Sequence, residues 1–514
     1  MEGLSRKLYL KLPAPTEADS RSSEARILSA LREQGYEARM TLKVMRKLYP
    51  LCEKSGWQLT ASLAWDGSCW VLVELEAGDT TREHYGLAVD LGSTTVVARL
   101  FDCNTGKCLA EDSAYNRQIA FGTDILTRIF YSKDQPEKLE ELRRAAVESI
   151  REVLEKLEKK TGIAPGGSIQ LVLAGNTTMV HFFLGLDAFC VFQTPYAVQA
   201  DRPGFLPAAE LELPVSGYVY CYPGKSNYLG GDIISGMVAT ELYKKEGISV
   251  FFDIGTNGEL VVGNREFLLC GAGAAGPALE GGVVRTGMRA SKGAVERVKL
   301  TENGFELGVI GGGRPEGICG SGIIDLLAEL FLAGWIDLRG KFVPEKSEKI
   351  QEKDGMYAVE YAPGLFFYQS DVDEFLRTKA AASTMVEYML GEAGIGMNDI
   401  SEFYVAGAFG KHVSKESAVT IGMYPDMDRE KLLNAGNSSL EGAGRLLLDK
   451  KILDELDDIL DKMVYIQFGA VDDFLELMVA AQALPHTDLE RYPSVMKKLE
   501  ERSKMQKTVS KKTN

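Results

Sequence analysis

Two short segments of the chain, residues 87–97 and 250–260, carry the same order of residue types. Each is an apolar run that ends in an aspartate, Asp90 or Asp253, and continues through a short polar turn into a second apolar run. The turn residues are Gly92, Ser93, Thr94 and Thr95 in the first segment and Gly255, Thr256 and Asn257 in the second. Val, Ile and Phe favour strands and Gly permits a tight reversal, so each segment predicts a β-hairpin.

The chemistry that suits these turns is the binding of a nucleoside triphosphate. Successive backbone N–H groups and hydroxyls in a tight turn can bind phosphate, and a carboxylate beside phosphate oxygens can hold a hydrated Mg²⁺. We therefore expect Asp90 and Asp253 to position Mg²⁺ and the turn residues to bind the phosphates of ATP. Either Glu259 or Asp232 is expected to orient the attacking water, and the sequence leaves the choice open. Such hydrolysis needs mainly placement and charge neutralisation.

Other glycine-rich turns follow or precede predicted elements in the same way. Asn176 follows a buried strand, Gly320 and Ser321 precede an apolar helix, and Gly407 and Gly410 follow the last strand. We expect Asn176, Gly320 and Ser321 to line the nucleotide cleft and the two later glycines to border adenosine. Lys379, on a predicted helix, is a weaker candidate for the same cleft.

An α/β unit over residues 85–245 would position the first turn. Its hairpin leads to a third predicted strand, an amphipathic helix, a buried strand and two further helices. These elements are expected near residues 108–112, 139–157 and 168–174, after Asn176 and from Asp232 onward. The turn Asn104-Thr105-Gly106-Lys107 is predicted to join two hairpin strands between Cys103 and Cys108.

A second unit over residues 246–486 repeats these events. After its hairpin come a third strand near residues 267–270, an apolar helix at 322–332, a helix from about Ser370 and a strand at 403–406. Ser370 and Asp373 have the spacing of a capping box. The repetition carries more weight than either turn alone, because a single turn of this kind arises often by chance.

The ends of the chain lack recognisable chemistry. Residues 1–84 predict a small α+β unit of a linker or middle type, with a strand near residues 8–13, a helix at 23–36 and a hairpin at 57–75. Residues 487–514 are polar and lysine-rich and predict a basic helical tail. Residues 271–276 fit a dinucleotide fingerprint, but Pro277 and later glycines interrupt the helix that it requires, so we expect a close-packed loop there.

Composition excludes several classes of function. The chain has 514 residues, which predicts two or three domains, and a net charge of −15, which argues against nucleic-acid binding. It has no apolar run of about 18 residues and no signal-peptide pattern, so no membrane span is expected. The eight cysteines form no Cys-x-x-Cys motif and the four histidines have no metal-ligand spacing. A reducing, cytoplasmic location fits these cysteines.

The motifs resemble those of the ASKHA superfamily, which includes sugar kinases, actin and heat-shock chaperones. Residues 85–95 and 253–259 are similar to its two phosphate motifs, and Val405-Ala406-Gly407-Ala408-Phe409-Gly410 is similar to its adenosine motif. The resemblance implies a two-lobed, actin-like α/β ATPase fold, a duplicated ribonuclease-H-like design, preceded here by the small α+β domain.

A closer resemblance is to the reductive activators of corrinoid proteins. It rests on Gly175-Asn176-Thr177-Thr178-Met179, Gly230-Gly231-Asp232, residues 275–282, Gly287-Met288-Arg289-Ala290, residues 317–325, Gly436-Asn437-Ser438-Ser439 and Leu484-Pro485-His486. The resemblance implies an ATPase that couples ATP to the reduction of Co(II) to Co(I) in a corrinoid protein of a methyltransferase system.

Activators of this kind commonly carry an N-terminal [2Fe–2S] domain, and this sequence supplies no iron–sulfur ligands. The resemblance therefore implies a separate ferredoxin-type electron donor and a corrinoid protein as partners, and a homodimer remains open. Two alternatives stay in view: a small-molecule kinase of the superfamily, for which no recognisable general-base Asp is found, and a non-redox ATP-dependent binding or regulatory module.

Overall fold

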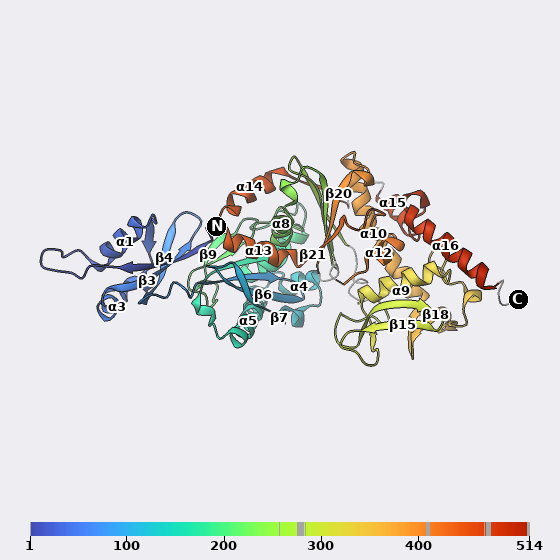
Figure 1. Cartoon of the computed structure of the whole chain (residues 1–514), viewed down its shortest axis with the longest axis horizontal. Helices are drawn as coiled ribbons and strands as arrows, with labels where there is room; N and C mark the ends of the chain where they lie inside the picture. The colour runs from blue at the N-terminus through green and yellow to red at the C-terminus, as the bar shows by residue number, and fades with distance from the viewer. Residues whose placement is uncertain are drawn as a thin grey trace. The chain divides into compact units, whose positions relative to one another are not determined.

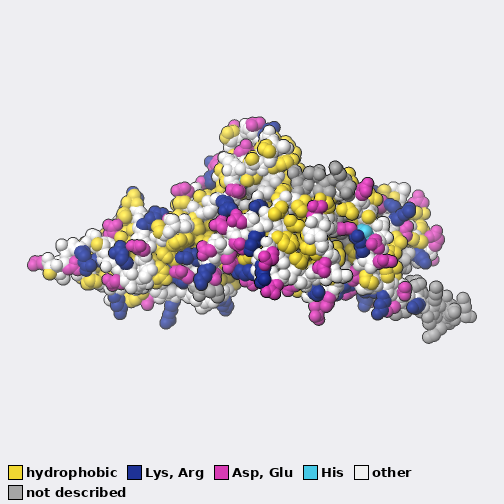
Figure 2. Space-filling model, turned by 90° about the horizontal axis from the view of Figure 1, so that it is seen from above, with side chains coloured by type: hydrophobic (Ala, Val, Ile, Leu, Met, Phe, Trp, Pro, Cys, Tyr) yellow, Lys and Arg dark blue, Asp and Glu magenta, His cyan; other side chains and the backbone are white. Residues whose placement is uncertain are grey.

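The computed structural model describes residues 2–255, 257–274, 282, 284–407, 412–466, 468 and 474–510 (Figure 1). The chain divides into two compact units. The first consists of Met1–Ala239 and Ser438–Asp461, and the second of Thr240–Asn437 and Lys462–Asn514. Within the described residues, no helix combines the length and apolar character needed to cross a bilayer. On the face shown in Figure 2, acidic and basic side chains are interspersed.

The first unit begins with a four-stranded sheet of order β1-β3-β4-β2. Its strands are β1 (Ser5–Lys11), β2 (Ala38–Met40), β3 (Gln58–Trp65) and β4 (Trp70–Ala77), and its helices are α1 (Ser23–Glu33), α2 (Leu42–Met45) and α3 (Leu48–Lys54). The strand, helix and hairpin predicted in residues 1–84 are thereby confirmed. Strands and helices enclose a core of their own, which includes Ile27, Leu59 and Leu72.

The second sheet of this unit has the order β7-β6-β5-β8-β10-β9. Its strands are β5 (Tyr85–Leu91), β6 (Thr95–Asp102), β7 (Lys107–Tyr115), β8 (Ser168–Gly175), β9 (Gly204–Pro207) and β10 (Tyr218–Cys221). Strands β5, β6 and β7 form an antiparallel meander, β8 is parallel to β5, and β10 is parallel to β8. The hairpins predicted at residues 87–97 and around 104–107 are confirmed.

Helices cover both faces of this sheet. They are α4 (Ile125–Ser132), α5 (Pro136–Thr161), α6 (Thr177–Leu184), α7 (Phe189–Phe192), α8 (Gly231–Thr240), α13 (Ser438–Leu448) and α14 (Ile452–Lys462). Leu87, Val89 and Leu91 belong to the core that contains the apolar side of α5. Side chains alternate along a strand, so the intervening positions of β5 face the other way, and there a Cβ on Gly86 would touch Leu447 of α13.

The second unit repeats the strand order. Its main sheet runs β21-β20-β11-β12-β13-β22. The strands are β11 (Ile248–Ile254), β12 (Asn257–Gly263), β13 (Leu268–Ala274), β20 (Ile400–Ala406), β21 (Leu432–Gly436) and β22 (Met463–Ile466). Again the first three form an antiparallel meander and the next two are parallel additions. Both sheets thus share the order third-second-first-fourth, and in each a further strand pairs in parallel with the fourth, which is the duplication expected from the two hairpins.

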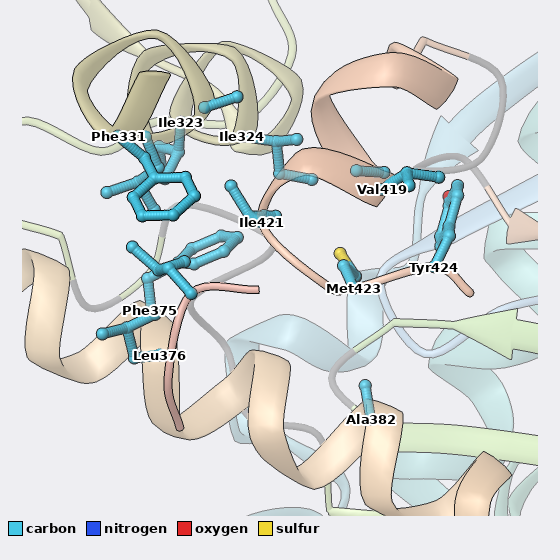
Figure 3. Packing of buried hydrophobic residues seen from close by; sticks show 14 of the residues in the cluster. Ile323, Ile324, Phe331, Phe375, Leu376, Ala382, Val419, Ile421, Met423 and Tyr424 are labelled. Carbon is cyan, nitrogen blue, oxygen red and sulfur yellow. The ribbon is translucent and has the colours of Figure 1, made fainter. Parts of the chain in front are cut away.

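The rest of the second unit packs around one large core. Two small sheets contain β14 (Ala294–Thr301), β15 (Gly304–Val309), β16 (Gly317–Ile318), β17 (Ile350–Lys353), β18 (Met356–Ala362) and β19 (Leu365–Tyr368). The helices are α9 (Gly320–Leu332), α10 (Gln369–Glu392), α12 (Lys415–Thr420), α15 (Phe474–Ala481) and α16 (Pro493–Ser510). Figure 3 shows Phe331 of α9 beside Phe375 of α10, with Ile421 at the end of α12 between the helices.

Two local expectations differ from the structure. Helix α10 begins at Gln369, and it is Asp371, not Asp373, whose carboxylate accepts the Tyr368 N–H at its start, while Asp373 pairs with Lys341. Residues 271–274 of the dinucleotide-like stretch form the end of β13 rather than a loop, and residues 275–281 lie outside the described residues.

The segment predicted as a tail contains buried residues. Tyr492 is 8% exposed and Val495 is fully buried, and both belong to the large core of the second unit. Arg502 of α16 reaches Glu329 of α9 at 3.2 Å. A lysine-rich composition therefore describes one side of α16, while the other side packs against α9.

Candidate functional site

The turn between β5 and β6 presents several unused hydrogen-bond donors. The Gly92 N–H donates to the Thr95 carbonyl at 3.1 Å, and a Cβ on Gly92 would lie 2.5 Å from that oxygen, so only glycine fits. Within the described part of the chain, the N–H groups of Ser93 and Thr94 and the hydroxyls of Ser93, Thr94 and Thr95 have no hydrogen-bond partner. All of these residues are half-buried. Such a turn can bind an anion.

Asp90 is held in place by a serine that lies far away in the sequence. Its Oδ1 accepts a hydrogen bond from the Ser439 hydroxyl at 2.9 Å, and Ser439 is in the first turn of α13. The Ser439 carbonyl accepts from the Ser235 hydroxyl of α8 at 2.6 Å. A Cβ on Gly442 would lie 1.9 Å from the Ser235 carbonyl, so glycine permits the close crossing of α8 and α13. Ser439 lies in the motif Gly436-Asn437-Ser438-Ser439, but nothing in that motif indicates its contact with Asp90.

Asn176 and Asp232 lie at the same edge of the sheet as Asp90. Leu91 at the end of β5 pairs with Gly175 at the end of β8. Asn176 then caps α6, because its Oδ1 accepts the Met179 N–H at 2.9 Å. Gly230 packs against this turn, since a Cβ there would lie 2.4 Å from the Asn176 Cα. Asp232 follows in the first turn of α8, half-buried, and its Oδ1 accepts from the Ile233 N–H.

In the second unit, three predicted residues come together. Asp253 and Glu259 are directly opposite each other across the β11–β12 hairpin and both are half-buried. Gly407, which follows β20, has φ of +86°, and a Cβ there would lie 2.8 Å from the Asp253 Oδ1. The backbone after β20 can therefore approach the carboxylate only because residue 407 is glycine.

The other predicted residues are placed elsewhere or fall outside the described residues. Gly320 and Ser321 begin α9, where the Ser321 hydroxyl is 3.3 Å from the Cys319 thiol and the turn packs on Val295. The described contacts there do not join them to Asp253. Gly255 lies in the bend after β11, whereas Thr256, Gly410 and the side chain of Asn257 lie outside the described residues.

Lys379 binds backbone carbonyl groups in the interior of the second unit. Its ammonium group is fully buried and donates to the carbonyls of Ala481 and Ala483, at 2.6 and 2.8 Å, and to that of Pro485. Burial lowers its pKa to about 7. The three acceptors are the last residue of α15 and two residues of the segment after it, so Lys379 attaches this part of the chain to α10.

A metal at this site would need oxygen ligands from outside the protein. Among the described residues, no group of three or more His, Cys, Asp or Glu side chains is arranged to hold a metal ion. Asp253 and Glu259 nevertheless face each other across one hairpin, and carboxylates directly opposite each other repel. A cation that also takes water and phosphate oxygens as ligands suits such a pair, and Mg²⁺ has this preference.

Comparison with known proteins gives matches along the chain. Residues 1–82 match the RACo linker region, residues 85–245 the RACo middle region, and residues 247–496 the C-terminal domain of RACo, the ASKHA domain. A solved structure described as a reductive activator for a corrinoid, iron-sulfur protein has a TM-score of 0.88 and 35% identity, and the match covers 96% of this chain and 81% of that one.

Two curated relatives are similar over most of the chain. The corrinoid activation enzyme RamQ of Eubacterium limosum is 34% identical over 395 residues, which are 73% of this chain and 66% of RamQ. The [Co(II) methylated amine-specific corrinoid protein] reductase of Methanosarcina barkeri is 25% identical over 411 residues, which are 74% of this chain and 73% of the reductase. This chain thus spans about two thirds of the length of RamQ.

Proposed function

The chain belongs to the RACo family of reductive activators of corrinoid proteins, and we propose that it couples ATP hydrolysis to the reduction of Co(II) to Co(I) in a corrinoid protein of a methyltransferase system. The similarity to a corrinoid activation enzyme and to a Co(II) corrinoid protein reductase supports this activity. A separate ferredoxin-type protein would supply the electron. The cytoplasm is part of the same proposal, because all eight cysteines are free thiols.

The observation that carries the nucleotide part of the proposal is the repeated pair of hairpins. In both sheets the first strand places a half-buried aspartate next to a glycine turn, Asp90 in one and Asp253 in the other. The free donors of residues 93–95 would bind phosphate oxygens, and Gly407 would let adenosine approach the backbone. Mg²⁺, when bound, would neutralise phosphate charge, with Asp90 and Asp253 holding its waters. Glu259 or Asp232 would orient the attacking water.

Coupling ATP to cobalt reduction requires a large difference between the affinities of the chain for the Co(II) and the Co(I) state of the corrinoid protein. The reduction transfers one electron, so each tenfold preference for the reduced partner shifts the potential by about 59 mV. A shift of ~180 mV therefore needs about three powers of ten of differential affinity. Nucleotide binding and hydrolysis would have to supply this difference through a change in conformation.

The test is an absorbance measurement on a corrinoid protein. Corrinoid protein in the Co(II) state, the purified chain, MgATP and a low-potential chemical reductant should give the Co(I) spectrum, and omission of ATP should prevent it. Asp90→Ala and Asp253→Ala should each reduce the rate at least about 100-fold. The matched control is Asp112→Ala, since Asp112 pairs with Lys160 on the outside of β7. Absence of any ATP-dependent Co(I) signal with several candidate corrinoid proteins would refute the proposal.

A further inference from the structure

A set of buried polar side chains supports the first phosphate turn from behind. Asn116, Gln118 and Arg128 are each 0% exposed. Asn116 bonds to both sides of the turn: its backbone N–H donates to the Thr94 carbonyl at 2.8 Å, and its Nδ2 donates to the Gly92 carbonyl at 2.9 Å. The conformation of the turn therefore depends on where Asn116 is held.

Gln118 connects Asn116 to a helix and to an arginine. Its backbone N–H donates to the Asn116 Oδ1 at 3.0 Å, and its Nε2 donates to the Leu142 carbonyl of α5 at 2.9 Å. Its Oε1 accepts from the Arg128 Nη1 at 3.4 Å. The same Nη1 lies 3.6 Å from the sulfur of Met179, in the helical turn that Asn176 caps. Arg128 is thus linked to two of the predicted ligand-binding turns.

The positive charge of Arg128 forms no direct ion pair in the described part of the chain, although the Asp124 carboxylate is near enough to attract it. Its Nε donates to the Gly122 carbonyl at 2.8 Å, but its Nη2 has no acceptor, and no ion pair with an acidic side chain is seen among the described residues. Burial lowers its pKa to about 10, so the group stays protonated at neutral pH. A buried guanidinium that is not directly bonded to a carboxylate is costly, and stability alone would favour an apolar residue there.

We propose that Arg128 is a positioning residue of the nucleotide site. Its buried charge attracts the triphosphate, which adds negative charge to that of Asp124, while its hydrogen bond to Gln118 holds Asn116 and thereby the turn of residues 92–95. The inference rests on the proposed nucleotide binding and adds to it a residue that does not touch the ligand. It predicts that the energetic effect of Arg128 falls on the phosphates and not on adenosine, because the charge acts through a poorly screened interior.

The experiment compares Arg128→Met with Arg128→Lys in the full chain, measuring dissociation constants for MgATP and adenosine by calorimetry and the melting temperature by calorimetric scanning. Arg128→Met should bind MgATP about tenfold more weakly or worse, bind adenosine unchanged, and melt at the same or a higher temperature. Arg128→Lys keeps the charge but not the fork of donors, so it should bind MgATP more weakly than the parent and severalfold more tightly than Arg128→Met. The proposal would be overturned if Arg128→Met bound MgATP like the parent. It would also be overturned if both variants lost MgATP and adenosine binding equally and their melting temperatures fell by a matching amount.

A matched control comes from another buried arginine. Arg26 is 2% exposed and pairs with Asp19 at 2.9 Å in the N-terminal sheet region, so Arg26→Met should lower the melting temperature and leave MgATP binding unchanged. If Arg128→Met does not fold, Gln118→Met replaces it, because it keeps the guanidinium and removes its link to Asn116. Several-fold weaker MgATP binding with unchanged adenosine binding is expected, and unchanged MgATP binding would again overturn the proposal.

The outcomes separate this inference from the proposed function. If the parent chain binds MgATP but yields no Co(I), the redox proposal fails and the role of Arg128 can still be upheld by the binding data. If the parent chain binds no adenine nucleotide, both fail. If Co(I) forms and Arg128→Met behaves like the parent, only the role of Arg128 fails.

Discussion

Asp90 and Asp253 occupy equivalent positions in the two sheets but have different neighbours. Asp90 accepts a hydrogen bond from Ser439, whereas Asp253 lies opposite Glu259 and against Gly407. A hydroxyl donor favours the ionised carboxylate at Asp90, while the second hairpin concentrates negative charge. Asp90 is therefore suited to keep an orientation that a fixed partner sets, whereas Asp253 is suited to attract a cation.

Ser439→Ala should weaken MgATP-dependent activity without unfolding the chain. The change removes the hydroxyl that orients the Asp90 carboxylate, and a hydrogen bond to a charged group contributes about 1.5 kcal/mol or more, which is roughly tenfold in rate. The control is the neighbouring Ser438→Ala, because the Ser438 hydroxyl is buried and has no hydrogen-bond partner among the described residues. ATP hydrolysis and melting temperature would be measured for both. Equal activity in the two variants would contradict this role for Ser439.

Gly92→Ala should disrupt phosphate binding more than stability. The added Cβ would lie 2.5 Å from the Thr95 carbonyl, so the turn must shift and its free N–H groups would lose their alignment. We expect at least tenfold weaker MgATP binding and a melting temperature lower by a few degrees. Gly166→Ala is the matched control, since the nearest atom to its Cβ would be the Pro214 carbonyl at 3.9 Å. A Gly92→Ala variant that binds MgATP like the parent would show that the turn does not contact phosphate.

At the scale of elements, residue His84 joins the two sheets of the first unit. It precedes β5, its Nε2 lies 2.8 Å from the Ser5 hydroxyl of β1, and its Nδ1 lies 3.3 Å from the Asn104 Oδ1 in the β6–β7 turn. The Asn104 oxygen only accepts, so Nδ1 donates and Nε2 accepts from Ser5. Burial favours the neutral ring and lowers the pKa of His84 to about 4, although the hydrogen bond to Asn104 acts in the opposite direction.

The stability of the chain should therefore fall in mild acid. The unfolded chain protonates this ring near pH 6.5 and the folded chain only near pH 4, so the unfolded state binds more protons between these values and stability is lost as pH falls through that window. At pH 5 the loss is about 2 kcal/mol relative to pH 7.5. Denaturant unfolding of the parent and of His84→Gln at both pH values measures it. The parent should lose more stability than the variant, and equal losses would contradict the assignment.

The sequence specified the elements better than the contacts among them. Alternating and helical apolar patterns predicted the two hairpins and helix α5, because burial on one face follows from periodicity within a few residues. The role of Ser439 depends on a partner 349 positions earlier, and no local pattern records that. Arg128 lies on an amphipathic helix, where an arginine is normally solvated, so its complete burial could not be predicted from α4 alone.

At the scale of the whole molecule, two separate segments of the chain form the first unit. Residues Ser438–Asp461 belong to that unit although about 200 residues of the second unit precede them. Helix α13 covers β5 and β8 and carries Ser439, so the first unit has neither a complete core nor a complete site without this late segment. A division of the sequence into consecutive domains therefore assigns residues 438–461 to the second unit, although they belong to the first. We therefore expect the first unit to fold only after the late segment has been added.

This arrangement predicts how fragments behave. A fragment of residues 1–239 should unfold without cooperativity, because the side of β5 and β8 that α13 covers would be exposed to water. Joining residues 438–461 to its end through a flexible linker of about 20 residues should restore a single cooperative transition in thermal denaturation. The same fusion with Gly442→Val should not, since even a Cβ at position 442 would lie 1.9 Å from the Ser235 carbonyl and keep α13 from α8. If residues 1–239 alone unfolded in the same cooperative transition as the fusion, the late segment would be dispensable for the core of the first unit.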